Sequence, residues 1–195
     1  MSKAKLLDRR AAVARLMRDR GDTLVISGLG SATYDLAAAG DDPKNFYLWG
    51  AMGGAAMMGL GLALAQPQHP VVVLTGDGEA LMGLGGFATI ALQSPKNLSV
   101  VVLDNGLYGE TGAQPTHTAA GADLAKIAAA CGVAETRTVT TMEEVGSLAD
   151  RVTRIGEGPL VAVVKIDVAS PPRVLPSRDG AWLKGRFRQA LGLEV

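Results

Sequence analysis

Apolar runs and amphipathic segments alternate along the whole chain. Short runs rich in β-branched residues, such as 71–75, are typical of parallel strands that are buried on both faces. Longer segments between them carry apolar residues at helical spacing or are apolar throughout. The expected strands are 23–27, 46–49, 71–75, 98–103, 134–139 and 160–166, and the expected helices are 2–20, 31–39, 55–65, 79–93, 121–131, 141–155 and 177–190.

This alternation predicts an α/β fold, a doubly wound and mostly parallel sheet of about six strands with helices on both faces. We expect one domain over residues 1–169, with 170–195 as an extended tail and C-terminal helix of that domain. Ser2 is expected to cap the first helix, and Thr141 with Glu144 to form a capping box. The helix that ends at Ala65 is apolar on every side, which favours a central position.

Composition narrows the classes of partner. Lys+Arg and Asp+Glu are equal at 19 each and no basic stripe is present, which argues against nucleic acid and anionic membranes as partners. The longest apolar stretch, 51–65, is shorter than the roughly 20 residues that span a bilayer. The charged N-terminal segment does not resemble a secretion signal, so we expect a cytoplasmic protein. Cys131 is the only cysteine, which excludes an intramolecular disulfide and, in its apolar setting, favours a buried inert thiol.

Polar groups follow two successive apolar strands at the point where each strand ends. Gly76-Asp77-Gly78 follows one strand, and Asn105 follows the next. In an open parallel sheet, ligands bind beyond the carboxyl ends of the strands, so both turns are expected to face one site. The glycines allow close approach of an anion, and the helix that follows offers its amino-terminal dipole to a phosphate. Because Asp77 alone would repel phosphate, we expect a divalent cation between them, and Mg²⁺ prefers such oxygen ligands.

The spacing of these motifs resembles the diphosphate-binding (PP) domain of thiamine diphosphate-dependent enzymes. Residues 46–53 resemble the segment that cradles the aminopyrimidine in that family, and 59–64 the helix behind it. Residues 81–91 and 104–116 complete the resemblance, which covers about 5–166. Within the family, the chain is most similar to sulfopyruvate decarboxylase beta subunits and to the C-terminal half of phosphonopyruvate decarboxylases.

The resemblance implies a Mg²⁺ site and a cofactor site. The metal ligands would be Asp77, Asn105 and the Leu107 carbonyl. Met52 would be the wedge that folds the cofactor, so that the amino group of its pyrimidine lies beside the reactive thiazolium carbon. The Gly50 carbonyl would accept a hydrogen bond from that amino group. Many relatives carry serine or alanine where this chain has Glu79, so we expect its backbone amide to serve rather than its side chain. The implied cofactor-binding residues are Gly30, Ser31, Gly50, Met52, Gly76, Asp77, Gly78, Glu79, Asn105, Leu107 and Tyr108.

The loop from Asn105 to His117 has no periodicity, which is typical of a functional loop. The resemblance implies that its part from Tyr108 to His117 covers the substrate. Glu110, Thr111 and Gln114 are its candidate catalytic residues beside Met52, each weighed against a solvated-loop reading. His117 could supply a proton near neutral pH, although a solvated role is the stronger expectation for it. His69, in a turn before a proline, is expected to be structural.

The reaction implied by the resemblance is decarboxylation of a small 2-oxo acid. Enzymes of this family also need a glutamate from a separate pyrimidine-binding domain, for which this chain has no room. The resemblance therefore implies an alpha subunit that carries this glutamate, in a hetero-oligomer with two or more copies of each chain.

Other readings remain open at this point. Within the same cofactor family, a carboligase or half of a 2-oxo acid oxidoreductase is an alternative, although the single cysteine argues against an iron–sulfur cluster here. A nicotinamide-binding Rossmann protein is a second alternative, from Gly28-Leu29-Gly30, but the third glycine of that fingerprint is absent. A non-catalytic module that binds or regulates a partner is a third.

Overall fold

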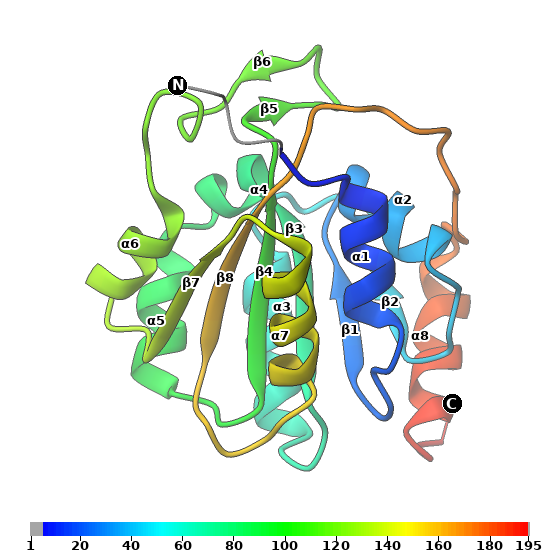
Figure 1. Cartoon of the computed structure of the whole chain (residues 1–195). Coiled ribbons are helices and arrows are strands. Elements are labelled where there is room, and N and C mark those ends of the chain that lie inside the picture. The colour runs from blue at the N-terminus through cyan, green and yellow to red at the C-terminus, as the bar shows by residue number, and fades with distance from the viewer. Residues whose placement is uncertain (1–5, 195) are drawn as a thin grey trace.

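Residues 6–194 are described by a computed structural model, in which parallel strands form a central sheet with helices on both faces (Figure 1). The sheet has six strands in the order β2-β1-β3-β4-β8-β7, and every neighbouring pair is parallel. The α/β fold expected from the sequence is therefore confirmed. The strands are β1 (Leu24–Ser27), β2 (Asn45–Tyr47), β3 (Val71–Gly76), β4 (Leu98–Asp104), β7 (Glu135–Val139) and β8 (Leu160–Lys165).

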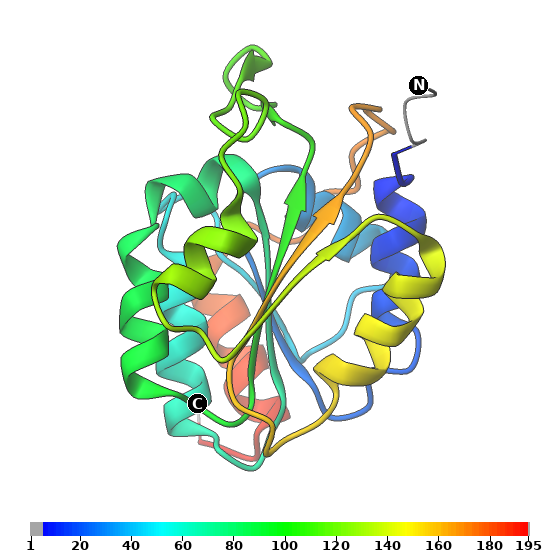
Figure 2. The same ribbon diagram turned by 60° about the vertical axis from the view of Figure 1, so that its left-hand side comes forward.

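Two layers of helices enclose the sheet (Figure 2). One face is covered by α1 (Arg9–Met17), α2 (Ser31–Ala38) and α7 (Met142–Val152). The other face is covered by α3 (Ala55–Ala65), α5 (Gly85–Gln93) and α6 (Leu124–Ala130). The C-terminal helix α8 (Gly180–Ala190) lies beside the edge strand β2. The rings of Phe46 and Phe187 pack edge to face there, with their centroids 5.9 Å apart.

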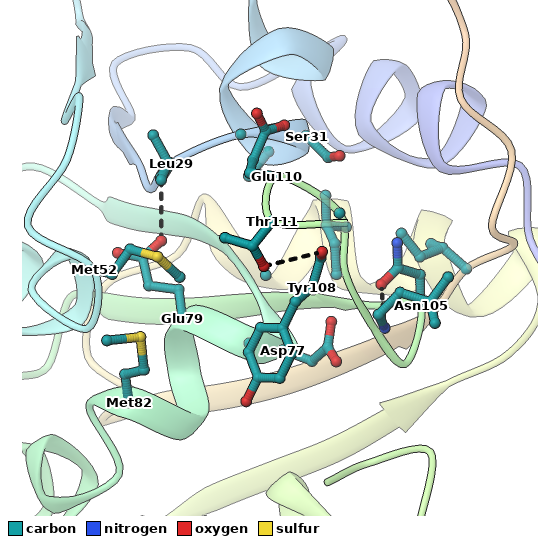
Figure 3. Close-up of a pocket in the computed structure, with 18 residues that line it drawn as sticks. Leu29, Ser31, Met52, Asp77, Glu79, Met82, Asn105, Tyr108, Glu110 and Thr111 are labelled. Atoms are coloured by element: carbon teal, nitrogen blue, oxygen red, sulfur yellow. Dashed lines mark hydrogen bonds between the residues drawn. The ribbon is translucent and has the colours of Figure 1, made fainter. Parts of the chain in front are cut away.

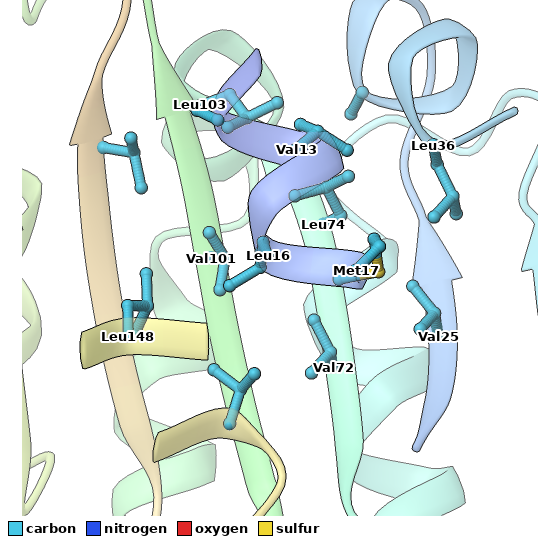
Figure 4. Close-up of a cluster of buried hydrophobic side chains, with 14 of the residues drawn as sticks. Val13, Leu16, Met17, Val25, Leu36, Val72, Leu74, Val101, Leu103 and Leu148 are labelled. Carbon is cyan, nitrogen blue, oxygen red and sulfur yellow. The ribbon is translucent and has the colours of Figure 1, made fainter. Parts of the chain in front are cut away.

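The core follows from the two-residue period of the strands. Val72 and Leu74 point to the α1 side, whereas Val71 and Val73 point to the α3 side, and all four are fully buried. Figure 4 shows Val13 and the neighbouring apolar residues of α1 packed over β3 and β4. Burial of each such side chain contributes about 1.5–3 kcal/mol, which is why the central strands are almost wholly apolar.

The first helix begins later than expected. The Ser2 cap lies outside the described residues, and α1 starts at Arg9 with Asp8 as its N-cap, where Oδ1 accepts from the Ala11 amide at 2.8 Å. Leu7 instead forms an isolated parallel bridge with Ile166, directly after β8. The expected helix over 2–20 was therefore too long, because residue 7 pairs with a distant segment that helical periodicity does not reveal.

The helix expected over 79–93 is two helices, α4 (Asp77–Met82) and α5, separated at Gly83. A Cβ at Gly83 would lie 2.4 Å from the carbonyl oxygen of Gly53, so the turn packs backbone to backbone against the segment before α3. This long-range contact lies where glycines at 83, 85 and 86 already weaken the helix, so the local sequence and the packing both favour the break.

The expectation that α3 is central was wrong. Ala55, Gly59, Leu60 and Ala63 face the sheet and are buried, but its opposite side is open. Its exposed large apolar residues are Met57, Met58 and Leu64. The helix is apolar all round, yet in this chain only one side of it finds a partner.

Three smaller expectations have clear outcomes. The capping box of Thr141 and Glu144 at the start of α7 is confirmed. The Cys131 thiol is half-buried rather than buried, at the C-cap of α6. Within residues 6–194, every helix is too short or too polar to cross a membrane.

The loop expected after Asn105 contains a small antiparallel hairpin, β5 (Leu107–Tyr108) and β6 (Gln114–Pro115). It rises above the carboxyl ends of the strands (Figure 1). The tail before α8 runs along the same end of the molecule and is held by hydrogen bonds. Trp49 Nε1 donates to the Ser177 carbonyl at 2.7 Å, and Arg10 donates to the Pro172 carbonyl at 2.9 Å. These contacts support our prediction that the tail belongs to the same domain.

Candidate functional site

A cavity of about 410 Å³ opens at the carboxyl ends of the central strands, beneath the β5–β6 hairpin (Figure 3). Five segments line it: the β1–α2 turn, the loop before α3, the β3–α4 junction, the segment that follows β4, and Ile166 directly after β8. The parallel sheet brings these segments together because successive strands end at the same edge. The lining residues are Leu29, Gly30, Ser31, Ala32, Met52, Gly76, Asp77, Gly78, Glu79, Met82, Leu103, Asn105, Leu107, Tyr108, Gly109, Glu110, Thr111 and Ile166.

Asp77 lies at the cavity base and is 2% exposed. The strand register pairs Gly76 with Leu103, which brings Asp77 beside Asp104. The Thr116 hydroxyl donates to Oδ2 of Asp77 at 2.5 Å, and the Thr118 hydroxyl approaches the same oxygen at 3.1 Å. Thr118 also donates to Oδ1 of Asp104 at 2.7 Å, so one hydroxyl joins the two carboxylates.

The environment of Asp77 disfavours its charged form. Burial raises the pKa of the Asp77 carboxyl, the Thr116 hydrogen bond lowers it, and the nearby charge of Asp104 raises it again. Asp104 has a cationic partner of its own in Lys165, whereas the side chains that bind Asp77 are neutral hydroxyls. A carboxylate buried in this way is suited to a cation that enters the cavity.

Asn105 and Leu107 also line the cavity, and Figure 3 shows Asn105 on the same side of it as Asp77. Oδ1 of Asn105 accepts from the Leu107 amide at 2.9 Å, which forms a tight turn directly after β4. Among the described residues, no group of three or more His, Cys, Asp or Glu side chains is placed to hold a metal. A metal here would therefore depend on Asp77 together with amide, carbonyl and ligand oxygens.

The β1–α2 turn forms the wall opposite α4. Gly30 has a φ of 76° and precedes the first turn of α2, where Ser31 and Ala32 also line the cavity. The Ser31 hydroxyl accepts from Nη1 of Arg9 at 2.7 Å. The first amides of a helix have no partner within the helix, and residues of this first turn line the cavity.

The Glu79 side chain has partners that the sequence did not indicate. It is 4% exposed, and its carboxylate accepts from the Leu29 amide, the Thr75 hydroxyl and the Ala55 amide. Burial raises the pKa of this carboxyl, although these hydrogen bonds and one from the Gly53 amide lower it. Our expectation concerned only the backbone amide of Glu79.

The loop before α3 has an unusual backbone. Gly50 and Gly53 have φ values of 93° and 88°, and Ala51 between them has a φ of 52°. Such a left-handed alanine is strained, and strain of this kind persists only where surrounding contacts hold it. The loop places the Met52 side chain in the cavity, near Glu79 (Figure 3). Gly50 is not one of the lining residues.

The hairpin contributes Tyr108, Glu110 and Thr111 to the cavity wall. The Tyr108 ring rests against Gly78, where a Cβ would lie 2.6 Å from the ring. Glu110 accepts from the Tyr34 hydroxyl at 3.3 Å and pairs with Arg173 of the tail at 3.5 Å.

Two other predicted loop residues lie elsewhere. Gln114 is exposed on β6, does not line the cavity and donates to the Thr111 carbonyl at 2.9 Å. The His117 side chain is exposed and is also absent from the lining.

Several site residues escaped the sequence reasoning. Thr116 and Thr118 hold Asp77, and their only signal was a pair of hydroxyls two residues apart in a loop assumed to serve the substrate. The apolar lining residues Leu29, Met82 and Ile166 carried no signal, because apolar residues at strand and helix ends are common.

Comparison with known proteins assigns the family. Residues 28–166 match the family model described as thiamine pyrophosphate enzyme, C-terminal TPP binding domain. This chain belongs to that family. It is 48% identical over 112 residues to the sulfopyruvate decarboxylase subunit beta of Methanothermobacter thermautotrophicus, covering 57% of this chain and 60% of that protein. It is 43% identical over 135 residues to the phosphonopyruvate decarboxylase of Streptomyces viridochromogenes, covering 69% of this chain and 34% of that protein.

The fold comparison agrees. The benzoylformate decarboxylase structure from Polynucleobacter necessarius superposes with a TM-score of 0.70 over 85% of this chain and 34% of that one, at 22% identity. That likeness bears on the fold alone. The chain thus spans about one third to three fifths of the length of these relatives. Membership of the thiamine pyrophosphate family also sets aside the nicotinamide-binding alternative.

Proposed function

We propose that this chain is the diphosphate-binding beta subunit of a two-subunit decarboxylase that depends on thiamine diphosphate and Mg²⁺ and acts on a small 2-oxo acid, of the sulfopyruvate or phosphonopyruvate type. The family match and the decarboxylases among the relatives support this proposal. The observation that carries it is the meeting of Asp77 with the Asn105–Leu107 turn at one cavity.

The donor set fits Mg²⁺. Asp77 is a buried carboxylate whose side-chain partners are neutral hydroxyls, so a bound cation would offset the cost of burying its charge. Asp77, Asn105 and the Leu107 carbonyl would supply protein oxygens, and diphosphate oxygens and water would complete the hard coordination that Mg²⁺ prefers.

The cavity walls also fit a diphosphate. The backbone amides of Gly78 and Glu79 lie in the first turn of α4, where helical amides have no partner within the helix. The Gly30–Ser31 turn brings the start of α2 to the same cavity. Gly76 and Tyr108 complete the predicted cofactor contacts, with Tyr108 closing the cavity from the hairpin.

When bound, thiamine diphosphate supplies a carbon nucleophile and an electron sink for loss of carbon dioxide from a 2-oxo acid. Met52 would support the folded form of the cofactor from below, and the Gly50 carbonyl would accept a hydrogen bond from its amino group. Glu110, Thr111 and Gln114 would orient the substrate from the hairpin. Of these three, Glu110 and Thr111 line the cavity, whereas Gln114 would act through Thr111, to which it is hydrogen-bonded.

The proposal requires an alpha subunit that contributes the pyrimidine-binding domain and a catalytic glutamate. The relatives named as beta subunits support a two-chain assembly, in which we expect two or more copies of each chain. The exposed side of α3 supports it as well, since Met57, Met58 and Leu64 are large apolar residues that lie exposed on this helix.

The test is reconstitution with a candidate alpha chain, sought among the reading frames next to the one that encodes this chain. We expect the pair to bind thiamine diphosphate only when Mg²⁺ is present, and to release carbon dioxide and an aldehyde from one member of a 2-oxo acid panel. Asp77→Ala should abolish the Mg²⁺-dependent binding. Asp19→Ala, at an exposed aspartate of the segment after α1, is the matched control and should bind normally.

Three outcomes would contradict parts of the proposal. Unchanged Mg²⁺-dependent binding by Asp77→Ala would refute the metal site. Full decarboxylase activity from this chain alone would refute the need for a partner. A ligated or oxidised product in place of an aldehyde would identify a carboligase or an oxidoreductase half.

A further inference from the structure

The Glu79 carboxylate is a junction between three segments of the cavity wall. Its Oε2 accepts from the Leu29 amide at 3.1 Å and from the Thr75 hydroxyl at 2.9 Å, and its Oε1 accepts from the Ala55 amide at 3.4 Å. These partners belong to the β1–α2 turn, to β3 and to the first residue of α3. All three are neutral dipoles, so a buried carboxylate is balanced here by hydrogen bonds alone.

The β1–α2 turn is shaped around this carboxylate. A Cβ at Gly28 would lie 1.7 Å from Oε2 of Glu79, so the turn passes directly over the carboxylate, and any larger residue at position 28 would have to displace it. Leu29, which follows, is held by its amide, and Gly30 then turns the chain into α2. The position of the turn that we assign to the diphosphate is thus set by a side chain about fifty residues away.

The loop that carries Met52 is held at its C-terminal end by the same group. Its residues 50, 51 and 53 all have positive φ, and the Gly54 amide donates to the Ala51 carbonyl at 2.8 Å. This short turn joins α3 at Ala55, whose amide binds Glu79. Figure 3 shows the Met52 and Glu79 side chains close together at one end of the cavity. A strained loop needs such an external contact to keep one conformation.

We propose that the Glu79 side chain is a positioning residue of the cofactor site: it holds the Leu29 turn and the Met52 loop in fixed places relative to the first turn of α4. This inference rests on the proposed function and deepens it, because it adds a side-chain role to the backbone contact assigned above. A serine or alanine at this position is too short to reach all three partners. The wall would then depend on packing alone.

The first test is backbone hydrogen exchange on the full-length chain without partner or cofactor. In Glu79→Gln and Glu79→Asp, we expect amide exchange over 28–31 and 50–55 to become at least tenfold faster. The sheet amides of β3 and β4 should keep their wild-type rates. Glu135→Gln is the matched control, since it alters a carboxylate that pairs with Arg137 and Arg151 at the opposite end of the sheet. Glu135→Gln should leave the amide exchange rates over 28–31 and 50–55 unchanged.

The second test uses the reconstituted pair. We expect Glu79→Gln to weaken thiamine diphosphate binding about tenfold and to lower kcat at saturating cofactor by a similar factor. The substrate KM should change less than twofold, because Glu79 would act through the cofactor and not on the substrate.

The outcomes separate this inference from the proposed function. Wild-type exchange rates over 28–31 and 50–55 in both variants would overturn the inference. A uniform increase in exchange across the sheet would also overturn it, because it would indicate a purely structural role for Glu79. Normal cofactor affinity and kcat in Glu79→Gln would overturn it as well. If the wild-type pair binds no thiamine diphosphate, the proposed function fails, while the exchange data still decide whether Glu79 holds the two segments.

Discussion

Replacing Asp77 with asparagine should stabilise the isolated chain while removing the carboxylate of the proposed metal site. Asparagine keeps the shape of the side chain and an oxygen that can accept from Thr116, but it removes the charge. Burying a carboxylate costs several kcal/mol, and Asp77 is 2% exposed. The charge of Asp104 adds to that cost.

The opposing contribution is the strength of the Thr116 hydrogen bond, because the single proton of Thr118 is donated to the nearer oxygen of Asp104. A bond to a charged acceptor contributes about 1.5–3 kcal/mol and one to a neutral acceptor about 0.5–1.5 kcal/mol. Neutralising Asp77 therefore forfeits roughly 1–1.5 kcal/mol from Thr116. Burial is the dominant influence, since the pKa of the Asp77 carboxyl is raised in spite of its hydroxyl partners. We expect Asp77→Asn to increase the free energy of unfolding by about 1 kcal/mol at pH 7, as is common when a functional group is neutralised.

The difference in stability between Asp77→Asn and the wild type should depend on pH. Because the folded-state pKa of Asp77 is raised, the wild type binds this proton more tightly when folded than when unfolded. The wild-type chain therefore loses stability relative to Asp77→Asn as the pH rises from the ordinary aspartate pKa of about 3.9 through the raised folded value. Below that window both side chains are neutral, and the difference should vanish.

The assay is urea unfolding of both chains between pH 3.5 and 8, followed by circular dichroism, with exposed Asp19→Asn as the control. Other carboxylates titrate equally in both chains, so their effects cancel in the difference. An Asp77→Asn chain that is less stable than wild type at pH 7, with a deficit that persists at acid pH, would refute this reasoning. The Thr116 hydrogen bond would then outweigh the burial cost.

Three further substitutions test the packing of the wall and the scaffold. Gly59→Ala should lower the free energy of unfolding by about 1–3 kcal/mol, because its Cβ would lie 2.1 Å from Cγ2 of Val73; wild-type stability in urea would show that α3 can move away from the sheet. Gly78→Ala should cost a similar amount through a 2.6 Å contact with the Tyr108 ring, and a double-mutant cycle with Tyr108→Ala should recover most of the loss, whereas strictly additive effects would rule out the clash. Thr141→Ala removes the hydroxyl of the capping box and should cost about 1 kcal/mol, seen as a lower urea midpoint with an unchanged slope; no change in midpoint would mean that the Glu144 bond suffices.

The sequence alone was enough to predict the fold, and most of the residues that it named for a site line one cavity in the structure. The apolar run of β3 is rich in β-branched residues and is closed by Gly76-Asp77-Gly78, a local pattern that favours a buried parallel strand with a polar end. The capping box of α7 is equally local, since both of its partners lie within four residues. In each case, neighbours in the sequence carry the physical cause.

Only the tertiary structure decided how the wall of the cavity is held. The break at Gly83 packs against the backbone of Gly53, and the Glu79 side chain binds amides and a hydroxyl from three segments. The sequence of α3 is apolar all round, yet the structure shows that only one side of this helix packs against the sheet. Periodicity reports which residues prefer burial, but not which distant group will meet them. These contacts arise between residues far apart in the chain, so no local pattern records them.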